Sequence, residues 1–190
     1  MRRKTDNQSD RMLNAAGRVF GGRPFHEVRM EDIANEAQVG KGTLYRYFIS
    51  KDELYLRLLE RAADQYSREI KATADKSQSA YNRLISLTKN SLDFFFSHPR
   101  LLELIQRAEV ERGSGTDSPW HEVRYEFITT VTELFREGES SGEFDVNDPQ
   151  LAALMLGGGM RAILLYGKLG NSADLAEKTV SSLVRLTRSK

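Results

Sequence analysis

Two short helical patterns separated by three residues constrain this chain more than any other feature of its sequence. The first pattern covers Met30 to Ala37 and the second covers Lys41 to Phe48, each with apolar residues three or four positions apart. The joint Gln38-Val39-Gly40 leaves room only for a tight turn. Two helices joined in this way predict a helix-turn-helix.

The second of these helices has one face suited to a protein core and another suited to DNA. Leu44 and Phe48 are four residues apart, so they share the inward face. Cations bind phosphates and guanine edges, hydroxyls bind phosphate oxygens, and a glycine lets a backbone approach the duplex. The residues of these kinds on the other face are Lys41, Gly42, Thr43, Tyr45, Arg46 and Tyr47. The alternative is a solvated basic helix whose tyrosines pack beside a core.

A longer motif surrounds this pair of helices. It comprises Ile33-Ala34, Ala37, Val39-Gly40-Lys41-Gly42-Thr43-Leu44-Tyr45, Tyr47-Phe48 and Ser50-Lys51-Asp52-Glu53-Leu54, preceded by Ala15-Ala16, Phe20 and Phe25. This stretch, about residues 9–55, closely resembles the DNA-binding domain of TetR-family transcriptional repressors. The resemblance implies a three-helix DNA-binding domain over residues 1–50 and a ligand-binding and dimerisation domain over residues 51–190.

Two positions depart from that family's pattern. Many members have a small hydroxyl residue at the start of the second and third helices, where this chain has Arg29 and Gly40. Glycine is an acceptable N-cap, whereas arginine is a poor one. The guanidinium of Arg29 is suited to a phosphate, so we expect Arg29 and Lys51 to bind the DNA backbone beside the groove.

The remaining sequence predicts an all-α protein of about nine helices. Apolar residues recur at helical spacing throughout, with breaks at glycine, proline and polar joints. The helices are expected at about residues 9–21, 30–37, 41–48, 51–70, 80–97, 100–111, 120–139, 149–166 and 172–188. Ser50 and Asp148 have the character of N-caps, and Arg2, Arg3 and Lys4 are expected to form a disordered arm that attracts DNA.

The last two helices carry apolar stripes that are wide enough to need a partner. The residues expected at a dimer interface are Leu151, Leu154, Met155, Ala162, Leu165, Thr179, Val180, Leu183 and Leu186. An intramolecular core is the alternative. The resemblance favours a homodimer, because family members pair through these two helices into a four-helix bundle. A two-fold dimer predicts an inverted-repeat operator.

Gly157-Gly158-Gly159 interrupts the eighth helical pattern. Glycine in a helix costs about 1 kcal/mol relative to alanine, so a compensating role is expected. Three roles are open: close helix crossing at the dimer interface, room for a ligand or a motion, or a break in the helix.

A transcriptional switch also needs an effector that binds one conformation better than the other. Candidate pocket residues are Phe95, Trp120, Arg124, Ile128, Met160 and Arg161, although most of them also suit a plain helical core. The resemblance implies a small, largely apolar effector that moves the fourth helix.

The charge distribution and the cysteine and histidine content further limit the classes of function that this chain could have. Residues 1–51 contain ten Lys/Arg and six Asp/Glu, which gives a charge of +4, whereas the remainder carries −3 within a net +1. A basic amino-terminal part suits DNA. There is no cysteine, and the three histidines are scattered, so we expect no enzyme activity, no metal site and no cofactor. No apolar run suggests a membrane span, and we expect a cytoplasmic protein.

These features together predict a sequence-specific DNA-binding regulator, expected to be a repressor that a small apolar effector releases from a palindromic operator. The alternative is a ligand-independent DNA-binding or architectural protein. Activation instead of repression is also open, because the position of the operator decides between them.

Overall fold

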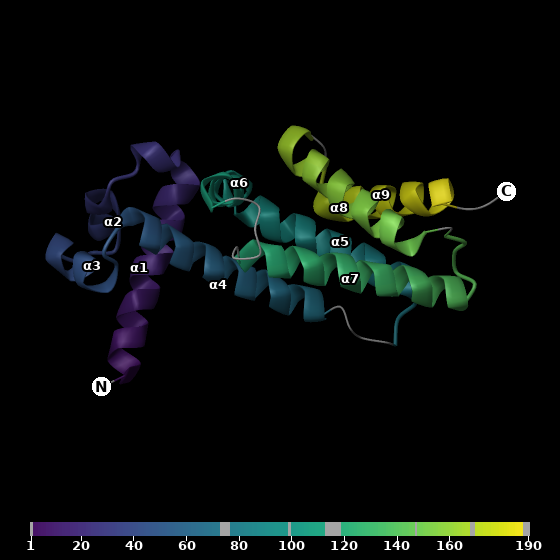
Figure 1. Ribbon diagram of the computed structural model, residues 1–190, viewed down its shortest axis with the longest axis horizontal. Helices are drawn as coiled ribbons and strands as arrows, with labels where there is room; N and C mark the ends of the chain where they lie inside the picture. The colour runs from purple at the N-terminus through teal and green to yellow at the C-terminus, as the bar shows by residue number, and fades with distance from the viewer. Residues whose placement is uncertain are drawn as a thin grey trace. The chain divides into compact units, whose positions relative to one another are not determined.

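The computed structural model describes residues 2–72, 77–98, 100–112, 119–146, 148–167 and 170–187 (Figure 1). Within these ranges the chain forms nine α-helices and one 3-10 helix and contains no strand, which confirms the all-α prediction. The elements are α1 (Arg2–Gly22), η1 (Phe25–Glu27), α2 (Met30–Glu36), α3 (Lys41–Tyr47), α4 (Lys51–Ala72), α5 (Ala80–Ser97), α6 (Leu101–Arg112), α7 (Pro119–Ser140), α8 (Pro149–Tyr166) and α9 (Ser172–Thr187). None of the described helices combines the length and apolar character that crossing a membrane requires.

The amino-terminal arm differs from the prediction. The sequence suggested disorder at Arg2, Arg3 and Lys4, whereas α1 begins at Arg2. Residues 2–16 contain no glycine or proline, so nothing in this segment stops the helix from extending toward the amino terminus. The predicted disordered arm is therefore wrong.

Two predicted helix starts are confirmed by their capping contacts. The carboxylate of Asp148 accepts a hydrogen bond from the backbone N–H of Leu151 (2.9 Å), and Pro149 is the first residue of α8. At the start of α4, the Ser50 hydroxyl accepts from the N–H of Glu53 (3.0 Å). The Glu53 carboxylate in turn accepts from the N–H of Ile49 (2.7 Å). These contacts fix where α8 and α4 begin.

The turn between α2 and α3 has an unusual backbone conformation. Gln38 lies in the left-handed region, with a φ of 55°. The next residue, Val39, donates its backbone N–H to the carbonyl of Ala34 (3.0 Å), which closes the end of α2. The chain thereby reverses within three residues, as the short joint in the sequence required.

The described residues belong to two compact units. Unit 1 contains Met1–Ala63 and His98–Trp120, and unit 2 contains Asp64–Ser97 and His121–Lys190. The helix α4 runs through both, with residues 51–63 in unit 1 and residues 64–72 in unit 2. The sequence placed a domain boundary at residue 50, whereas the packing groups the start of α4 and the whole of α6 with α1, α2 and α3.

An aromatic cluster forms the centre of unit 1. Phe20 stacks on Phe25 with ring centroids 5.5 Å apart, and Tyr55 meets Phe25 edge-on at 5.2 Å. All three side chains are buried. Aromatic pairs in these geometries add to the free energy of burial. The cluster therefore joins α1, η1 and α4.

The same cluster explains why α6 belongs to unit 1. The Tyr55 hydroxyl donates a hydrogen bond to the carbonyl of Leu104 in α6. The guanidinium of Arg107 lies 3.7 Å from the centre of the Phe25 ring and pairs with Asp52 at 3.5 Å. No sequence pattern indicated these contacts, because their partners are about 50 to 80 residues apart.

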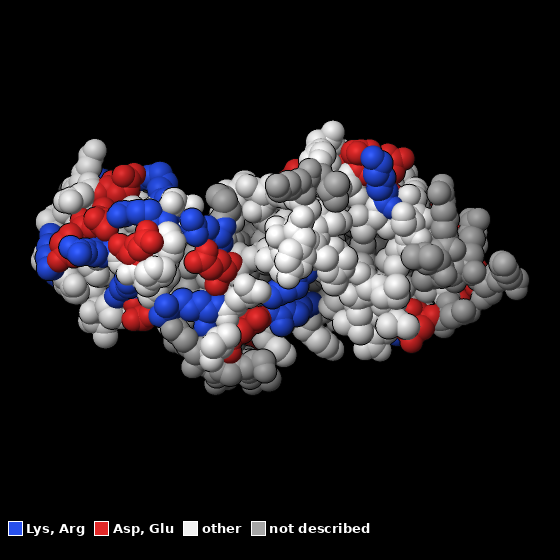
Figure 2. All heavy atoms as spheres, turned by 90° about the horizontal axis from the view of Figure 1, so that it is seen from above, with Lys and Arg blue, Asp and Glu red and all other residues white. Residues whose placement is uncertain are grey.

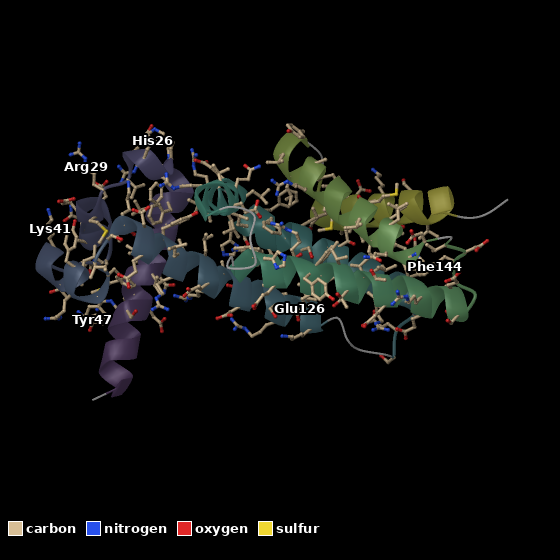
Figure 3. All side chains as sticks on the ribbon, in the orientation of Figure 1. His26, Arg29, Lys41, Tyr47, Glu126 and Phe144 are labelled. Carbon is tan, nitrogen blue, oxygen red and sulfur yellow. The ribbon has the colours of Figure 1, made fainter. Side chains whose placement is uncertain are left out.

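Unit 2 is a helical bundle in which α5 packs against both α8 and α9. Tyr66 of α4 stacks on Phe94 of α5, with ring centroids 5.0 Å apart, and donates its hydroxyl to Ser91 (2.8 Å). Burial of this phenol raises the pKa of Tyr66. On the neighbouring helix α7, Glu126 accepts a hydrogen bond from the Ser67 hydroxyl (2.6 Å) (Figure 3). These contacts attach the end of α4 to α5 and α7.

One glycine allows a close approach at the end of α7. Gly138 lies directly beside the ring of Phe144, which is buried and also packs on Phe135 with ring centroids 5.8 Å apart. A methyl group added at Gly138 would lie 2.0 Å from a ring carbon of Phe144. Any side chain at this position would require the buried Phe144 ring to move, so glycine suits the site.

We expect Gly138→Ala to lower the free energy of unfolding by about 1 to 3 kcal/mol, because the added methyl group overpacks this region. Chemical denaturation followed by circular dichroism measures the change. Gly21→Ala is the control, since a methyl group there meets no atom within 4 Å. Equal stability of the two variants would show that the Phe144 ring can move aside.

Candidate nucleic-acid interface

The helix α3 is held by a buried face and presents the opposite face to solvent. Leu44 and Phe48 are buried, whereas Lys41, Gly42, Tyr45 and Arg46 are exposed and Thr43 and Tyr47 are half-buried. Gly40 occupies the N-cap position in an extended conformation and makes no side-chain cap. The first turn of α3 therefore leaves backbone N–H groups that water or an anionic ligand can bind.

Lys41 is paired with a carboxylate from the preceding helix. Its ammonium group donates a hydrogen bond to Glu31 of α2 and lies 5.7 Å from the centre of the Tyr45 ring. The hydrogen bond from Lys41 is the main cause that holds the pKa of Glu31 below its usual value, and it raises the pKa of Lys41. Both groups are therefore ionised at neutral pH.

Arg46 and Tyr47 form a second pair on this face. The guanidinium carbon of Arg46 lies 5.7 Å from the centre of the Tyr47 ring. The Tyr47 hydroxyl donates to the side-chain oxygen of Gln8 in α1 (3.0 Å). Because α1 extends farther toward the amino terminus than predicted, it supports this tyrosine from the side. Figure 3 shows Tyr47 on the α3 segment beside α1.

Arg29 is the N-cap residue of α2, and its side chain is exposed (Figure 3). Its backbone N–H donates to the carboxylate of Asp32 (3.0 Å), and Arg23 pairs with the same carboxylate at 3.1 Å. The hydrogen bond from the Arg29 backbone, with the charge of Arg23, lowers the pKa of Asp32. Asp32 thus supplies the cap that the Arg29 side chain does not, and the guanidinium stays in solvent.

Lys51 has a different environment from the one expected. Its ammonium group donates to the carbonyls of Phe25 and Val28, both at 2.9 Å, and lies 4.2 Å from the centre of the Phe25 ring. Two of its three N–H donors are thus used inside unit 1. The structure therefore gives Lys51 a structural role that the sequence did not indicate, because the chain around η1 places two carbonyls beside it. The predicted phosphate contact of Lys51 stays a prediction.

The charge of unit 1 is more evenly distributed than the sequence suggested. Figure 2 shows Lys/Arg and Asp/Glu side chains interleaved over the amino-terminal part of the face in view. Besides Lys41 with Glu31, Arg18 pairs with Glu36 at 2.6 Å. The positive charge of residues 1–51 is therefore partly neutralised by ion pairs with carboxylates of α2.

The candidate pocket residues do not gather within one unit. Trp120 belongs to unit 1, and the other five belong to unit 2. Met160 is buried, Phe95, Ile128 and Arg161 are half-buried, and Arg124 is exposed. The effector pocket stays a prediction.

The predicted dimer residues divide between the two helices. Those on α8 are exposed: Leu151, Leu154, Met155, Ala162 and Leu165. On α9, Val180 and Leu183 are buried (1% and 6% exposed) and Thr179 is half-buried, because α9 packs against α5. The prediction is corrected for Val180 and Leu183, which are core residues. The Leu186 side chain lies outside the described residues.

The surface over α8 has an apolar character. Figure 2 shows a broad area of uncharged side chains on this part of the face in view. The exposed large apolar residues of α8 include Tyr166, which is 83% exposed. Exposed apolar patches of this kind on a soluble protein mark interaction surfaces.

The three glycines of α8 do not break the helix, which runs without interruption from Pro149 to Tyr166. The third of the alternatives drawn from the sequence is therefore wrong. A methyl group at Gly157 would lie 3.4 Å from Ile128 of α7, whereas methyl groups at Gly158 and Gly159 would meet nothing within 4 Å. Gly157 favours close packing of α8 on α7, and Gly158 lies on the exposed side.

We expect Lys51→Met to lower the free energy of unfolding by about 1 to 2 kcal/mol, since two carbonyls lose a charged donor. Thermal and chemical denaturation measure the change. Arg46→Met is the control, because Arg46 is exposed on the outer face of α3 and its removal should leave stability unchanged. If Lys51→Met is as stable as the wild type, the structural role of Lys51 is contradicted and DNA-backbone binding is the role left for it.

Comparisons with known proteins agree with this geometry. The family model described as bacterial regulatory proteins, tetR family, matches residues 12–58. The chain is 34% identical over 89 residues to the HTH-type transcriptional activator FasR of Mycolicibacterium smegmatis, a match that covers 47% of this chain and 41% of FasR. It is 26% identical over 132 residues to the HTH-type transcriptional repressor SCO4008 of Streptomyces coelicolor, covering 70% of this chain and 65% of that protein.

The fold is also found among solved structures. The transcriptional regulator FadR from Bacillus subtilis, solved in complex with stearoyl-CoA, matches 92% of this chain and 96% of its own with a TM-score of 0.71 at 20% identity. The sequence match to FasR spans about two fifths of that relative's length, so it is concentrated in one part of the molecule. The structural match extends the shared fold over almost the whole chain.

Proposed function

We propose that this chain, which belongs to the TetR family of bacterial regulatory proteins, regulates transcription by inserting α3 into the major groove of an operator. The observation that carries the proposal is the anchoring of α3 by Leu44, which leaves Lys41, Tyr45 and Arg46 exposed on one face. A short helix held in this way and carrying cations and phenols is suited to base edges and phosphates.

The roles on this surface differ from residue to residue. Arg46 is the candidate for a bidentate contact with guanine, because a guanidinium presents two parallel donors. Thr43, Tyr45 and Tyr47 offer hydroxyls to phosphates, and the exposed Arg29 is placed to neutralise a flanking phosphate. Gly42 has no side chain to hold the backbone of α3 away from the duplex.

We propose that the active form is a homodimer whose copies associate through α8. The support is the exposed apolar face of that helix, which the chain's own core leaves uncovered. A two-fold dimer would set two copies of α3 in successive major grooves about 34 to 36 Å apart and would recognise an inverted repeat.

The proposed mode of action is repression relieved by a small, largely apolar effector bound in unit 2. Support comes from the apolar interior of that unit and from the similar fold of FadR, which was solved with stearoyl-CoA. The helix α4 contains residues of both units. A ligand bound in unit 2 that moves α4 would therefore also move the residues of α4 that pack with the DNA-binding helices. The protein would act in the cytoplasm, where its operator is.

The named relatives include both an activator and a repressor. The position of an operator relative to the promoter determines whether such a regulator activates or represses. Repression is proposed because the match to the repressor SCO4008 covers 70% of this chain, whereas the match to the activator FasR covers 47%.

We expect selection from random duplex DNA to enrich an inverted repeat, and Arg46→Ala to relax the preference at one position in each half-site. Loss of a bidentate contact should cost about 1 to 3 kcal/mol at that position. Sequencing of the retained DNA and fluorescence anisotropy measure both results. The matched control is Arg136→Ala, because Arg136 is exposed on α7 in unit 2. An unchanged preference in Arg46→Ala would remove Arg46 from the recognition surface.

We expect Leu154→Glu to convert the dimer to a monomer at micromolar concentration, because a charge would be buried in an apolar interface. Sedimentation velocity measures the change. Leu154 is 51% exposed in the single chain, so the variant should fold. Val110→Glu, at a residue 84% exposed on α6, is the control and should remain dimeric. A dimeric Leu154→Glu variant would place the interface elsewhere.

A ligand-independent DNA-binding protein remains the second candidate. It is favoured by one observation: the candidate pocket residue Arg124 is exposed at the surface. Titration of the operator complex with long-chain acyl-CoA separates the two functions. Release of DNA supports the ligand-controlled regulator, and retention across a series of apolar ligands supports the alternative.

A further inference from the structure

An ion pair joins Lys41, a candidate DNA-binding cation on α3, to the carboxylate of Glu31 on α2. Lys41 is the first residue of α3, and Glu31 is the second residue of α2. Their side chains are 57% and 48% exposed, so the pair lies at the surface and is open to a competing ligand. The positive charge of Arg29 also acts on Glu31. The carboxylate therefore lies near two of the cations that we assign to DNA binding.

We propose that Glu31 is a specificity-determining residue: its carboxylate holds the Lys41 ammonium and thereby weakens binding to DNA that offers phosphates without the correct base sequence. This inference rests on the proposed function, since it concerns how α3 discriminates among duplexes.

The physical basis is competition for one ammonium group. Non-specific affinity comes from cations that replace counterions along the phosphate backbone. Lys41 is already neutralised by Glu31, so it adds little to that affinity while the pair persists. On an operator, base contacts such as that of Arg46 hold α3 in one position. A phosphate or guanine edge then stays beside Lys41 and replaces the carboxylate. Glu31 therefore penalises non-specific DNA more than the operator.

The chain contains a matched ion pair on the same helix. Glu36 of α2 pairs with Arg18 of α1, and their side chains are 43% and 61% exposed. Glu31→Gln and Glu36→Gln each remove one negative charge and one exposed ion pair from α2. They differ in the partner that is released, because only Glu31 pairs with α3. A general effect of net charge would appear equally in both variants.

The experiment compares the wild-type chain with these two variants by fluorescence anisotropy, using a random-sequence duplex and the operator obtained by selection. We expect Glu31→Gln to bind the random duplex about two- to fivefold more tightly, the range of one exposed ion pair. The slope of log K against log salt should steepen by about 0.9, the value for one more phosphate contact. Operator affinity should change less, and Glu36→Gln should match the wild type. Thermal unfolding checks that all three proteins fold.

The same variants in a Lys41→Ala background decide whether Glu31 acts through Lys41. We expect the effect of Glu31→Gln to disappear there. A gain in affinity that persists without Lys41 would overturn the inference, because it would reflect simple repulsion between Glu31 and phosphates. An unchanged or weakened affinity of Glu31→Gln would overturn it as well. A wild-type chain that binds no duplex at low salt would instead overturn the proposed function, and this outcome needs no variant to observe.

Discussion

The packing around Phe25 is the interaction on which the candidate DNA-binding part of the molecule depends. Its ring contacts Phe20 and Tyr55, and the cationic groups of Lys51 and Arg107 lie close to it. Removing Lys51 would leave two carbonyls without this donor, and removing Arg107 would leave the carboxylate of Asp52 without this cation. Either change would also remove one of the cations beside the Phe25 ring. Through these contacts a single residue of a 3-10 turn fixes α1, the start of α4 and α6 with respect to one another.

The surface of α3 shows that charge in a sequence and charge available to a ligand are different quantities. Residues 1–51 carry a net +4, but Lys41 is paired with Glu31 and two donors of Lys51 bind carbonyls. Arg46 stays exposed on the face of α3 that Leu44 orients. Binding driven by total charge would have similar affinity for any duplex. Ion pairs within the helix-turn-helix reduce that contribution, so a larger share of the binding free energy must come from base contacts.

The helices α8 and α9 have similar apolar stripes in the sequence, but in unit 2 one stripe is at the surface and the other is in the core. The stripe on α9 is buried against α5, and the stripe on α8 is partly exposed. Both helices have leucine and valine or methionine at helical spacing, so their sequences alone predict the same role. The difference arises because α8 uses Ala152, Ala153 and Leu156 to face its own unit, which leaves Leu151, Leu154 and Met155 on the opposite side.

The sequence by itself determined the helices, the turn between α2 and α3, the caps at Ser50 and Asp148 and the outward set on α3. These features depend on residues within about one helical turn of each other, where spacing and cap chemistry act directly. Only the tertiary structure decided the role of Lys51, the burial of Val180 and Leu183, the attachment of α6 to unit 1 and the partner of Lys41. Each of these depends on contacts between segments that the chain brings together only when it folds, and local patterns contain no information about such partners.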